Sequence, residues 1–407
     1  MTALPIRLNN LRCLVAASSL MVLPVLADSG HQHETAAAGE TGQDRTPWQL
    51  DVVMGYQKTA TPLIAGFLPY DGHYRSAGFG LQHLDIGRSF RLPDQGVYGQ
   101  VVVSRHSSST DIHEAWIGHR SGAWQLQAGQ QLVDLGWLNR LHSHDRLFVD
   151  LPLMYQAMWG GEWSEAEVRL GYQRLDLDSN SGLWQWHSAL SLLGTSQMNT
   201  ARDGVAAMVT TAVSARYGQW QHAIKLDVYG AEVGRRGMQL FSTSTATHSH
   251  GSTATEYFDG GIGHIAMGLS SEWDNTWGRW RLQGEYQQRQ EKGDLSSAAG
   301  QTTDASAVLD LRSWGSYLDL SWQQSRLAAG VRWQTLGSDV GLSRVSGDDL
   351  ADSILNHQSR SPSYLNMLIA WRLPWQGSKL RLQYNVPLTD ALALPRIQLQ
   401  WLYSVAF

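Results

Sequence analysis

The last stretch of the chain, Ile397 to Phe407 (IQLQWLYSVAF), places an apolar side chain at every second position up to the final residue. Successive side chains of a β-strand point to opposite faces, so this spacing predicts a strand with one apolar face. An amphipathic strand that ends in an aromatic residue is the feature by which the bacterial barrel-assembly machinery recognises outer-membrane barrels. The stretch therefore predicts a β-barrel closed by this strand, with that machinery as a partner through Phe407.

The same alternation recurs along the chain, for example over 48–56, 265–273 and 280–286. Mean hydropathy is −0.28 although the chain has 18 Trp and 14 Tyr, and no segment after residue 27 approaches the run of about 20 apolar residues that a spanning helix needs. A barrel gives a negative mean hydropathy because only alternate residues face lipid. The alternative left open at this point is a soluble periplasmic β-protein.

Residues 1–27 have the form of a secretory signal peptide, with Arg7 and Arg12 before the apolar run 13–26 and Ala27 at the cleavage site. Its removal leaves 380 residues (407 minus 27) with a net charge of −7 (29 basic minus 36 acidic) and no cysteine. This charge argues against a nucleic-acid partner. We expect residues 28–46 to be a disordered tail and residues 47–407 to form a barrel in the outer membrane of a Gram-negative bacterium, in contact with its lipid and lipopolysaccharide.

The lengths of the connections predict the topology. Short turns at 374–378, 323–325, 275–278 and 218–219 alternate with long connections at 387–394, 337–361, 291–312 and 230–260. Outer-membrane barrels have short periplasmic turns, longer outer loops and an even number of strands. The alternation holds only if 134–163 is a single outer loop, the third. We therefore predict an all-β, transmembrane antiparallel barrel of about 16 strands, porin-like, with a long third loop folded inward. Porins of this size are often trimers, so a homotrimer is a further expectation.

Tryptophans near the short turns predict an aromatic girdle at the periplasmic interface. The alternative is that they are core aromatics. The residues are Trp124, Trp220, Trp277, Trp280, Trp314, Trp371 and Trp375.

The stretch Leu132 to Glu162 (LVDLGWLNRLHSHDRLFVDLPLMYQAMWGGE) does not alternate, and it mixes charged residues with large apolar ones. A barrel of this size holds a water-filled passage that an infolded loop can narrow and charge. We predict that seven residues of the loop line the pore or its constriction: Asn139, Arg140, His142, His144, Asp145, Arg146 and Asp150. The facing wall candidates are Arg279, Arg281, Glu285, Arg381 and Gln383. The alternative is a merely solvated loop and wall.

Histidines occur as pairs spaced by two residues. The pairs are His142 with His144, His248 with His250, and His31 with His33. Neutral imidazole binds Zn²⁺ and similar metals, so these pairs are metal-binding candidates, with solvated histidines as the alternative. We expect no required cofactor, and Zn²⁺ only as a cargo or ligand. Because no G-x-S-x-G or H-E-x-x-H motif is present, we predict that the protein is not an enzyme.

The block 112–162, which contains GWLNRLHSHDRLFVDLPL, resembles a family of porin-like outer-membrane proteins that are commonly labelled zinc-regulated, TonB-dependent receptors. The histidine loop at 246–251 and the run WRLQGEYQQRQEKGDL at 280–295 are also similar to that family. The motif residues carried over by this resemblance are Asn139, His142, His144, Phe148, Asp150 and Pro152. The resemblance implies a role in metal supply.

A TonB-dependent receptor has a plug domain ahead of a barrel of about 22 strands. Strands are expected from Trp48 onward here, which leaves no room for a plug. We therefore expect passive uptake of small solutes, with zinc or a zinc complex as cargo. The alternatives are a general diffusion porin with incidental histidines, an outer-membrane barrel enzyme, and a surface-binding protein with a blocked lumen.

Overall fold

The computed structural model describes residues 47–58, 77–106, 109–159, 161–178, 182–194, 206–238, 256–297, 306–346, 361–375, 377–389 and 395–407. The predicted signal peptide and tail, with His31 and His33, lie outside these residues. The predicted pair His248 and His250 also lies outside them.

The described residues form a closed barrel of sixteen strands in which each strand pairs antiparallel with its sequence neighbours and β1 pairs with β16. This confirms the predicted fold class and strand number. The strands are β1 (Gln49–Gln57), β2 (Gly78–Leu92), β3 (Val97–His106), β4 (Ser109–Ser121), β5 (Trp124–Leu132), β6 (Ser164–Asp178), β7 (Gly182–Leu193), β8 (Ala206–Tyr217), β9 (Trp220–Met238), β10 (Glu256–Asn275), β11 (Gly278–Ser297), β12 (Ser306–Gln324), β13 (Leu327–Ser346), β14 (Ser363–Arg372), β15 (Ser378–Pro387) and β16 (Arg396–Ala406).

The terminal strand closes the barrel. β16 pairs with β1 over the full length of β1, with Val52 opposite Tyr403. Beyond the register, Trp48 N donates to Phe407 O at 3.0 Å and Phe407 N donates to Trp48 O at 2.9 Å. β16 thus takes the edge of β1 that would otherwise be exposed, and the sheet closes on itself.

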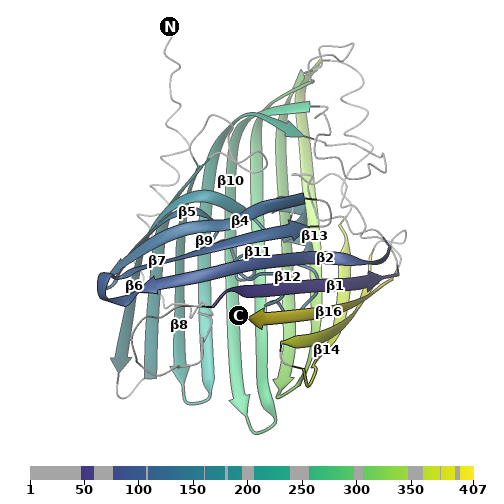
Figure 1. Cartoon of the computed structure of the whole chain (residues 1–407). Coiled ribbons are helices and arrows are strands. Elements are labelled where there is room, and N and C mark those ends of the chain that lie inside the picture. The colour runs from purple at the N-terminus through teal and green to yellow at the C-terminus, as the bar shows by residue number, and fades with distance from the viewer. Residues whose placement is uncertain are drawn as a thin grey trace.

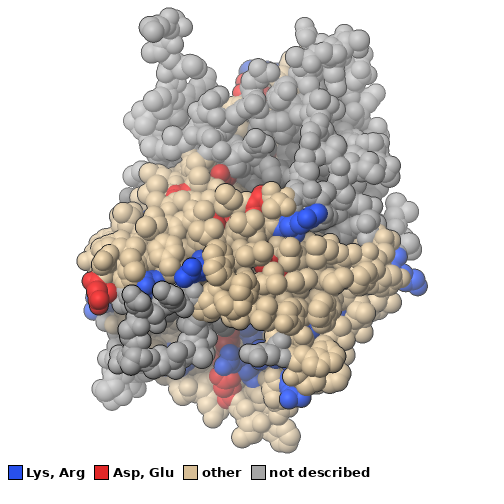
Figure 2. Space-filling model, viewed as in Figure 1, with Lys and Arg blue, Asp and Glu red and all other residues tan. Residues whose placement is uncertain are grey.

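The two faces of the sheet differ in polarity. On the outer face Ile265 is 46% and Leu269 61% exposed, whereas the opposite face carries Gln283, Glu285 and Arg289 at 4% exposure or less. Since side chains alternate along each strand, an apolar exterior and a polar interior follow directly from the sequence pattern. The face built by β1, β2 and β16 accordingly carries few charged residues (Figure 2).

The barrel wall is uneven in height. Strands β9 to β13 have 19 or 20 residues each, whereas β1 and β14 to β16 have 9 to 11. The long strands run steeply along one side of the molecule, and β1, β2 and β16 cross the other side at a large angle to them (Figure 1). One side of the barrel therefore extends far beyond the other at the end opposite the short turns.

The long connections predicted at 230–260, 291–312 and 337–361 are wrong over much of their length, because β9, β11, β12 and β13 continue through them. These segments contain several glycines, which are common in loops. In the structure Gly260 of β10 lies opposite Gly293 of β11, and a Cβ at Gly260 would lie 2.4 Å from a backbone oxygen of β11. Glycine allows this close approach of two paired strands, so here it marks a strand and not its end.

Tryptophans flank the short turns, as expected for a girdle. Trp277 and Trp375 are 74% and 67% exposed, and Trp220 stacks on Trp273 with ring centroids 5.2 Å apart. Trp314 is an exception. It pairs with Gly337 in the middle of β12, because that strand begins at Ser306 and not at the tryptophan. The prediction that Trp314 borders a short turn is therefore wrong.

The connection between β5 and β6 contains a short helix, α2 (Leu153–Trp159), which contacts β12 and β13. Within the part of the chain that the structure describes, no helix is long and apolar enough to cross a membrane.

Substitution of Leu269 by Arg tests the assignment of the outer face. Leu269 is well exposed on β10 and lies between the short turn and the long extension of that strand. We expect a loss of about 2–4 kcal/mol in the free energy of unfolding from lipid vesicles, because a cation on the lipid face near the membrane centre must be desolvated. Urea unfolding followed by tryptophan fluorescence measures this, with Thr276→Arg in the short turn as the control. An equal effect of both variants would contradict the assignment.

Candidate constriction at the third loop

The described residues of the β5–β6 connection, 133–159 and 161–163, form what we call the third-loop segment. Its two ends are joined by Asn139, whose side chain is fully buried. Asn139 Nδ2 donates to Val133 O at 2.7 Å and to Trp163 O at 2.8 Å, while its Oδ1 accepts from Trp163 N at 2.8 Å. Asn139 was predicted to line the pore. The structure shows it bracing the base of the segment.

The backbone N–H groups of the segment are bonded to side chains of the barrel interior. Gly136 N donates to Asp227 of β9 at 2.7 Å and Trp137 N donates to Glu285 of β11 at 2.9 Å. Further along, Leu153 N donates to the amide oxygen of Gln334 on β13 at 2.8 Å, and Val149 N donates to that of Gln383 on β15 at the same distance. Strands spread around the barrel thus hold one segment of chain.

Basic side chains of the wall hold the carbonyl groups of the same segment. Lys225 Nζ donates to Gly136 O at 2.6 Å, and it also forms an ion pair of 2.7 Å with Asp134. Arg332 donates to Asp150 O at 2.8 Å, and Arg381 donates to Arg146 O at 2.6 Å and to Ser143 O at 3.0 Å. Arg289 donates to Met158 O. These bonds satisfy carbonyls that an irregular backbone leaves without partners.

One side of the segment is apolar and well packed. Trp159 and Trp163 stack with ring centroids 4.4 Å apart, and the guanidinium of Arg289 lies 4.7 Å from the ring centroid of Trp159. Met154 packs on Gly315 of β12, where an added Cβ would lie 2.6 Å from its own Cβ. These side chains join a buried cluster with residues of β8 to β14, among them Met208, Tyr229, Leu309, Tyr317, Leu336 and Tyr364.

The other side of the segment is polar and meets β1, β2 and β4. His142 Nε2 lies 2.7 Å from Glu114 Oε1 of β4. His144 Nε2 lies 3.7 Å from Asp51 of β1, and its Nδ1 lies 3.8 Å from Asp85 of β2. The rings of His142 and His144 are stacked with centroids 5.5 Å apart. We refer to this group, with His113, Arg146 and Glu162, as the histidine edge.

Opposite charges set the protonation states along this edge. Burial alone lowers the pKa of His142, but the hydrogen bond and charge of Glu114, with the charge of Glu162, raise it to about 9. Burial alone raises the pKa of Glu162, but the charge of Arg146 and the bond from His113 hold that pKa well below its usual range. At neutral pH the edge therefore contains an ionised carboxylate at Glu162 and a protonated His142.

Of the other residues predicted to line the pore, one anchors the segment, one joins the histidine edge and one is half exposed. Asp150 pairs with Arg396 of β16 and accepts a bond from Gln398 at 3.2 Å, so it anchors the segment. Asp145 lies 3.4 Å from His144 at the histidine edge. Arg140 is half exposed and lies 3.6 Å from Asp134.

Three of the five predicted wall residues contact the segment, and two form ion pairs elsewhere. Glu285, Arg381 and Gln383 bond the segment, as described above. Arg279 instead pairs with Asp274 beside a short turn, and Arg281 pairs with Glu272 at 3.2 Å.

The sequence did not predict the two residues that β4 contributes to the histidine edge. His113 and Glu114 are adjacent, and regular alternation would send them to opposite faces. The register of β3 against β4 shifts here, with Val102 opposite Glu114 and Val103 opposite Ile112, so His113 is the extra residue of a bulge. Both side chains are buried as a result. Two neighbouring titratable residues in an otherwise alternating strand were the available signal.

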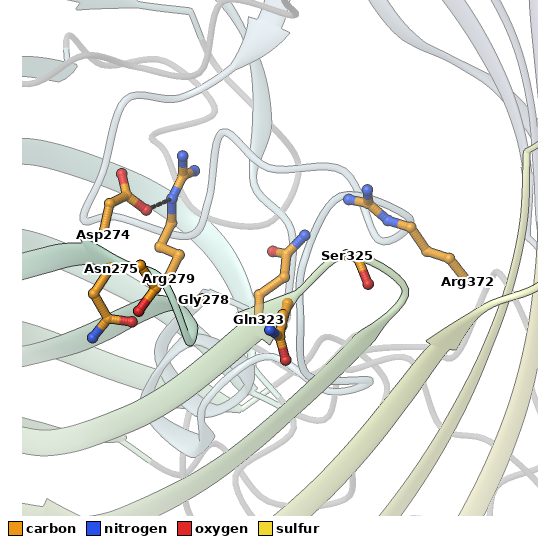
Figure 3. Close-up of a pocket in the computed structure, with 9 residues that line it drawn as sticks. Asp274, Asn275, Gly278, Arg279, Gln323, Ser325 and Arg372 are labelled. Atoms are coloured by element: carbon orange, nitrogen blue, oxygen red, sulfur yellow. Dashed lines mark hydrogen bonds and ion pairs between the residues drawn. The ribbon is translucent and has the colours of Figure 1, made fainter.

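A shallow pocket also lies between short turns at the other end of the barrel. It is lined by Asp274, Asn275, Gly278, Arg279, Gln323, Ser325 and Arg372 (Figure 3). Its Asp274–Arg279 pair is more than half exposed, which is typical of a solvated rim. We assign it no chemistry.

No known protein family and no curated protein sequence matches the chain. Among solved structures, OmpF of Salmonella typhi in complex with daunomycin is similar, with a TM-score of 0.51 and 11% identity over 88% of this chain and 97% of that one. OprB of Pseudomonas putida at high pH gives 0.50 and 9% over 88% and 94%. The trimer form of OmpT of Vibrio cholerae gives 0.50 and 7% over 88% and 98%.

At these identities the likeness concerns the fold, which is the porin-type barrel of Gram-negative outer membranes. The comparisons give no support to the zinc-regulated, TonB-dependent receptor family that the sequence resembles.

Gly136→Ala tests how tightly the segment is docked. Gly136 has φ of +58°, and a Cβ there would lie 1.9 Å from the Tyr155 hydroxyl and 2.3 Å from Glu285. The matched control is Gly218→Ala in a short turn, with φ of +55° and no atom within 4 Å of the added Cβ. We expect the control to lose about 1–2 kcal/mol of stability from the left-handed backbone. Gly136→Ala should lose about 1–3 kcal/mol more, because the docked backbone is overpacked.

Urea unfolding of both variants measures the difference. Equal losses of stability in the two variants would mean that the segment moves freely to accept the added methyl group and is not docked as described.

Lys225→Met tests the buried ion pairs that hold the segment. Lys225 lies 2.7 Å from Asp134 and 3.8 Å from Asp227, and its side chain is 4% exposed. Its removal leaves two buried carboxylates without this counter-ion, for which we expect a loss of about 3–5 kcal/mol in stability. The control is Arg279→Met, whose pair with Asp274 is solvent-exposed, and where we expect about 0–1 kcal/mol. Cleavage of the segment by trypsin at Arg140 should accelerate in Lys225→Met alone. Unchanged stability and cleavage would show that the pair does not anchor the segment.

Proposed function

We propose that the protein is a passive diffusion channel for small hydrophilic solutes in the outer membrane of a Gram-negative bacterium, with the third-loop segment as its constriction. The observation that carries this proposal is the two-sided docking of the segment. Its apolar side is packed against β8 to β14, and its polar side faces β1, β2 and β4 across the histidine edge. Solutes would pass along the histidine edge, on the polar side of the segment.

The charges along this path favour cations. Five carboxylates contributed by the segment and by the facing strands outnumber the one arginine of the histidine edge, Arg146, and rings of acidic side chains select cations in channels. The carboxylates are Asp51, Asp85, Glu114, Asp145 and Glu162. The basic side chains of the opposite wall, such as Arg332 and Arg381, bond carbonyls of the segment.

The low exposure of the histidine edge limits the size of the solute. His142, Asp85 and Asp51 are each less than a tenth exposed, so the passage at this level suits small solutes. Zinc as a specific cargo has no support in the comparisons, and the general diffusion channel, with the similar structures named above, is the better-supported interpretation. A homotrimer is part of the proposal, because one of the similar structures is a trimer form.

The same low exposure favours a second candidate, a surface-binding protein whose lumen is blocked by the segment. Planar-bilayer conductance separates the two. A channel should give discrete current steps and, in a KCl gradient, a reversal potential of the sign expected for cation preference.

The double variant Asp51→Asn/Asp145→Asn should move the reversal potential toward zero, because it removes two carboxylates from the path. Asp274→Asn, at the exposed rim of a short turn, should leave the reversal potential unchanged. Absence of current from folded wild type would favour the blocked-lumen protein, and anion preference in wild type would contradict the assigned path.

A further inference from the structure

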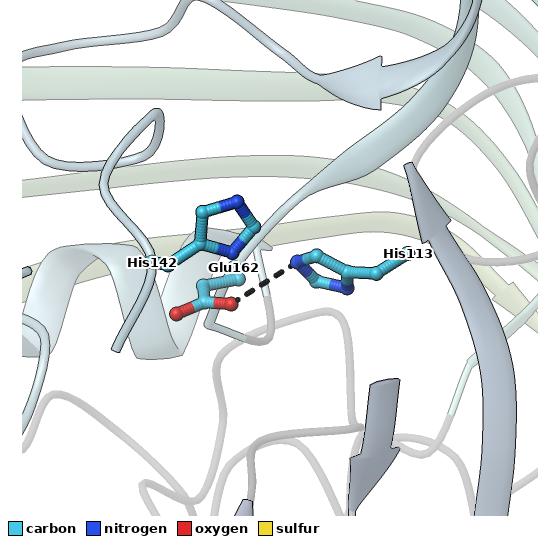
Figure 4. Close-up of side chains that lie close together, drawn as sticks. All are labelled: His113, His142 and Glu162. Carbon is cyan, nitrogen blue, oxygen red and sulfur yellow. Dashed lines mark ion pairs between the residues drawn. The ribbon is translucent and has the colours of Figure 1, made fainter. Parts of the chain in front are cut away.

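Two histidines and a carboxylate converge within the histidine edge. His113 of β4 and His142 and Glu162 of the third-loop segment each offer one donor atom, and these atoms all lie within 4.8 Å of one another. His113 Nε2 lies 3.3 Å from Glu162 Oε2. That separation is about the edge of a tetrahedron with metal–ligand bonds of about 2.0–2.1 Å. The three side chains point toward one another from a strand and from both arms of the loop (Figure 4).

The orientation of His142 is that of a metal ligand. Its Nε2 is bonded to Glu114 Oε1 at 2.7 Å, while its Nδ1 is buried and has no hydrogen-bond partner among the described residues. In Figure 4 the ring directs one nitrogen toward the carboxylate of Glu162. Histidine ligands of metals commonly donate their second ring nitrogen to a carboxylate, which fixes the ring and raises its basicity.

The surroundings of the cluster favour a dication. Arg146 bonds Oε1 of Glu162, so Oε2 of that carboxylate is directed to His113. The carboxylates of Glu114 on β4 and Asp85 on β2 lie nearby, against the single guanidinium of Arg146. A bound divalent ion, which would replace the proton of His142, would offset the negative charge of these carboxylates and of Glu162 in a site of low dielectric.

We propose that His113, His142 and Glu162 form a binding site for a divalent transition-metal ion. Two imidazole nitrogens and one carboxylate oxygen match borderline ions such as Zn²⁺ and Co²⁺, whereas Ca²⁺ and Mg²⁺ take oxygen ligands. Three protein ligands leave a position for water or a solute. Because one ligand comes from β4 and two come from the third-loop segment, the ion joins the loop to the barrel wall.

The site lies within the histidine edge, beside the proposed passage of solutes, but its test does not depend on conductance. Folded full-length protein in detergent is freed of metal with a chelator and titrated with Co²⁺, whose visible absorption reports coordination by nitrogen and oxygen ligands. We expect one equivalent to bind with an intense absorption band, and one equivalent of Zn²⁺ to displace it. The bound ion should also raise the melting temperature, since a ligand that binds only the folded state stabilises it.

The double variant His113→Gln/Glu162→Gln should abolish the absorption band and the rise in melting temperature. Glu114→Gln, which keeps all three ligands, should weaken Co²⁺ binding by about 10–100-fold, because it removes the support of His142. The control is His222→Gln, an exposed histidine near the short-turn end of β9 that is bonded to Ser271 at 3.0 Å, and this variant should bind as wild type does.

Absence of stoichiometric binding in wild type would overturn the proposal. So would binding that persists in the double variant, since the ion would then be held by other histidines of the chain. If the double variant does not fold, unchanged affinity in Glu114→Gln overturns it equally. A channel that conducts but binds no metal would remove this site and leave the proposed function standing.

Discussion

The hydrogen bonds between the barrel wall and the backbone of the third-loop segment are the interaction on which the rest of this structure depends. Apart from α2, the segment has little regular secondary structure, so its N–H and C=O groups find few partners within it. A buried backbone group without a partner costs about 1–3 kcal/mol. Wall carboxylates and amides accept from the N–H groups, and wall Lys and Arg side chains donate to the carbonyls. This matching fixes the backbone of the segment against the wall.

The matching also gives the segment two unlike sides. Its apolar residues join those of β8 to β14 in one buried cluster, which accounts for inward-facing Met208, Leu309 and Leu336 on strands whose interior is otherwise polar. The cations of β9, β11, β13 and β15 bond carbonyls of the segment, and most of them also pair with carboxylates of the same part of the wall. The carboxylates of β1, β2 and β4 belong to the histidine edge, on the other side of the segment.

Much of the fold could be predicted because alternation with a period of two is a local property. The closing strand, the number of strands and the place of 134–163 as a single connection between the fifth and sixth strands were all recovered from it. The height of the wall was not. Pairing of Gly260 with Gly293 keeps two strands together where their composition resembles a loop. Trp314 lies in mid-strand because β12 and β13 also stay paired beyond it. Strand ends depend on which residues have partners across the sheet, and that information is not local.

By itself the sequence determined that this chain forms a barrel with an apolar exterior, and that charged and histidine-rich residues gather in one interrupting stretch. It identified His142 and His144 but not their partners. Only the tertiary structure decided that His142 meets Glu114, that Asp150 and Asn139 anchor the segment, and that His113 and Glu162 complete a cluster with His142. The physical reason is that a one-residue bulge in β4 turns both His113 and Glu114 inward. Contacts between a loop and strands distant in the sequence are set by register, and register is a property of the closed sheet.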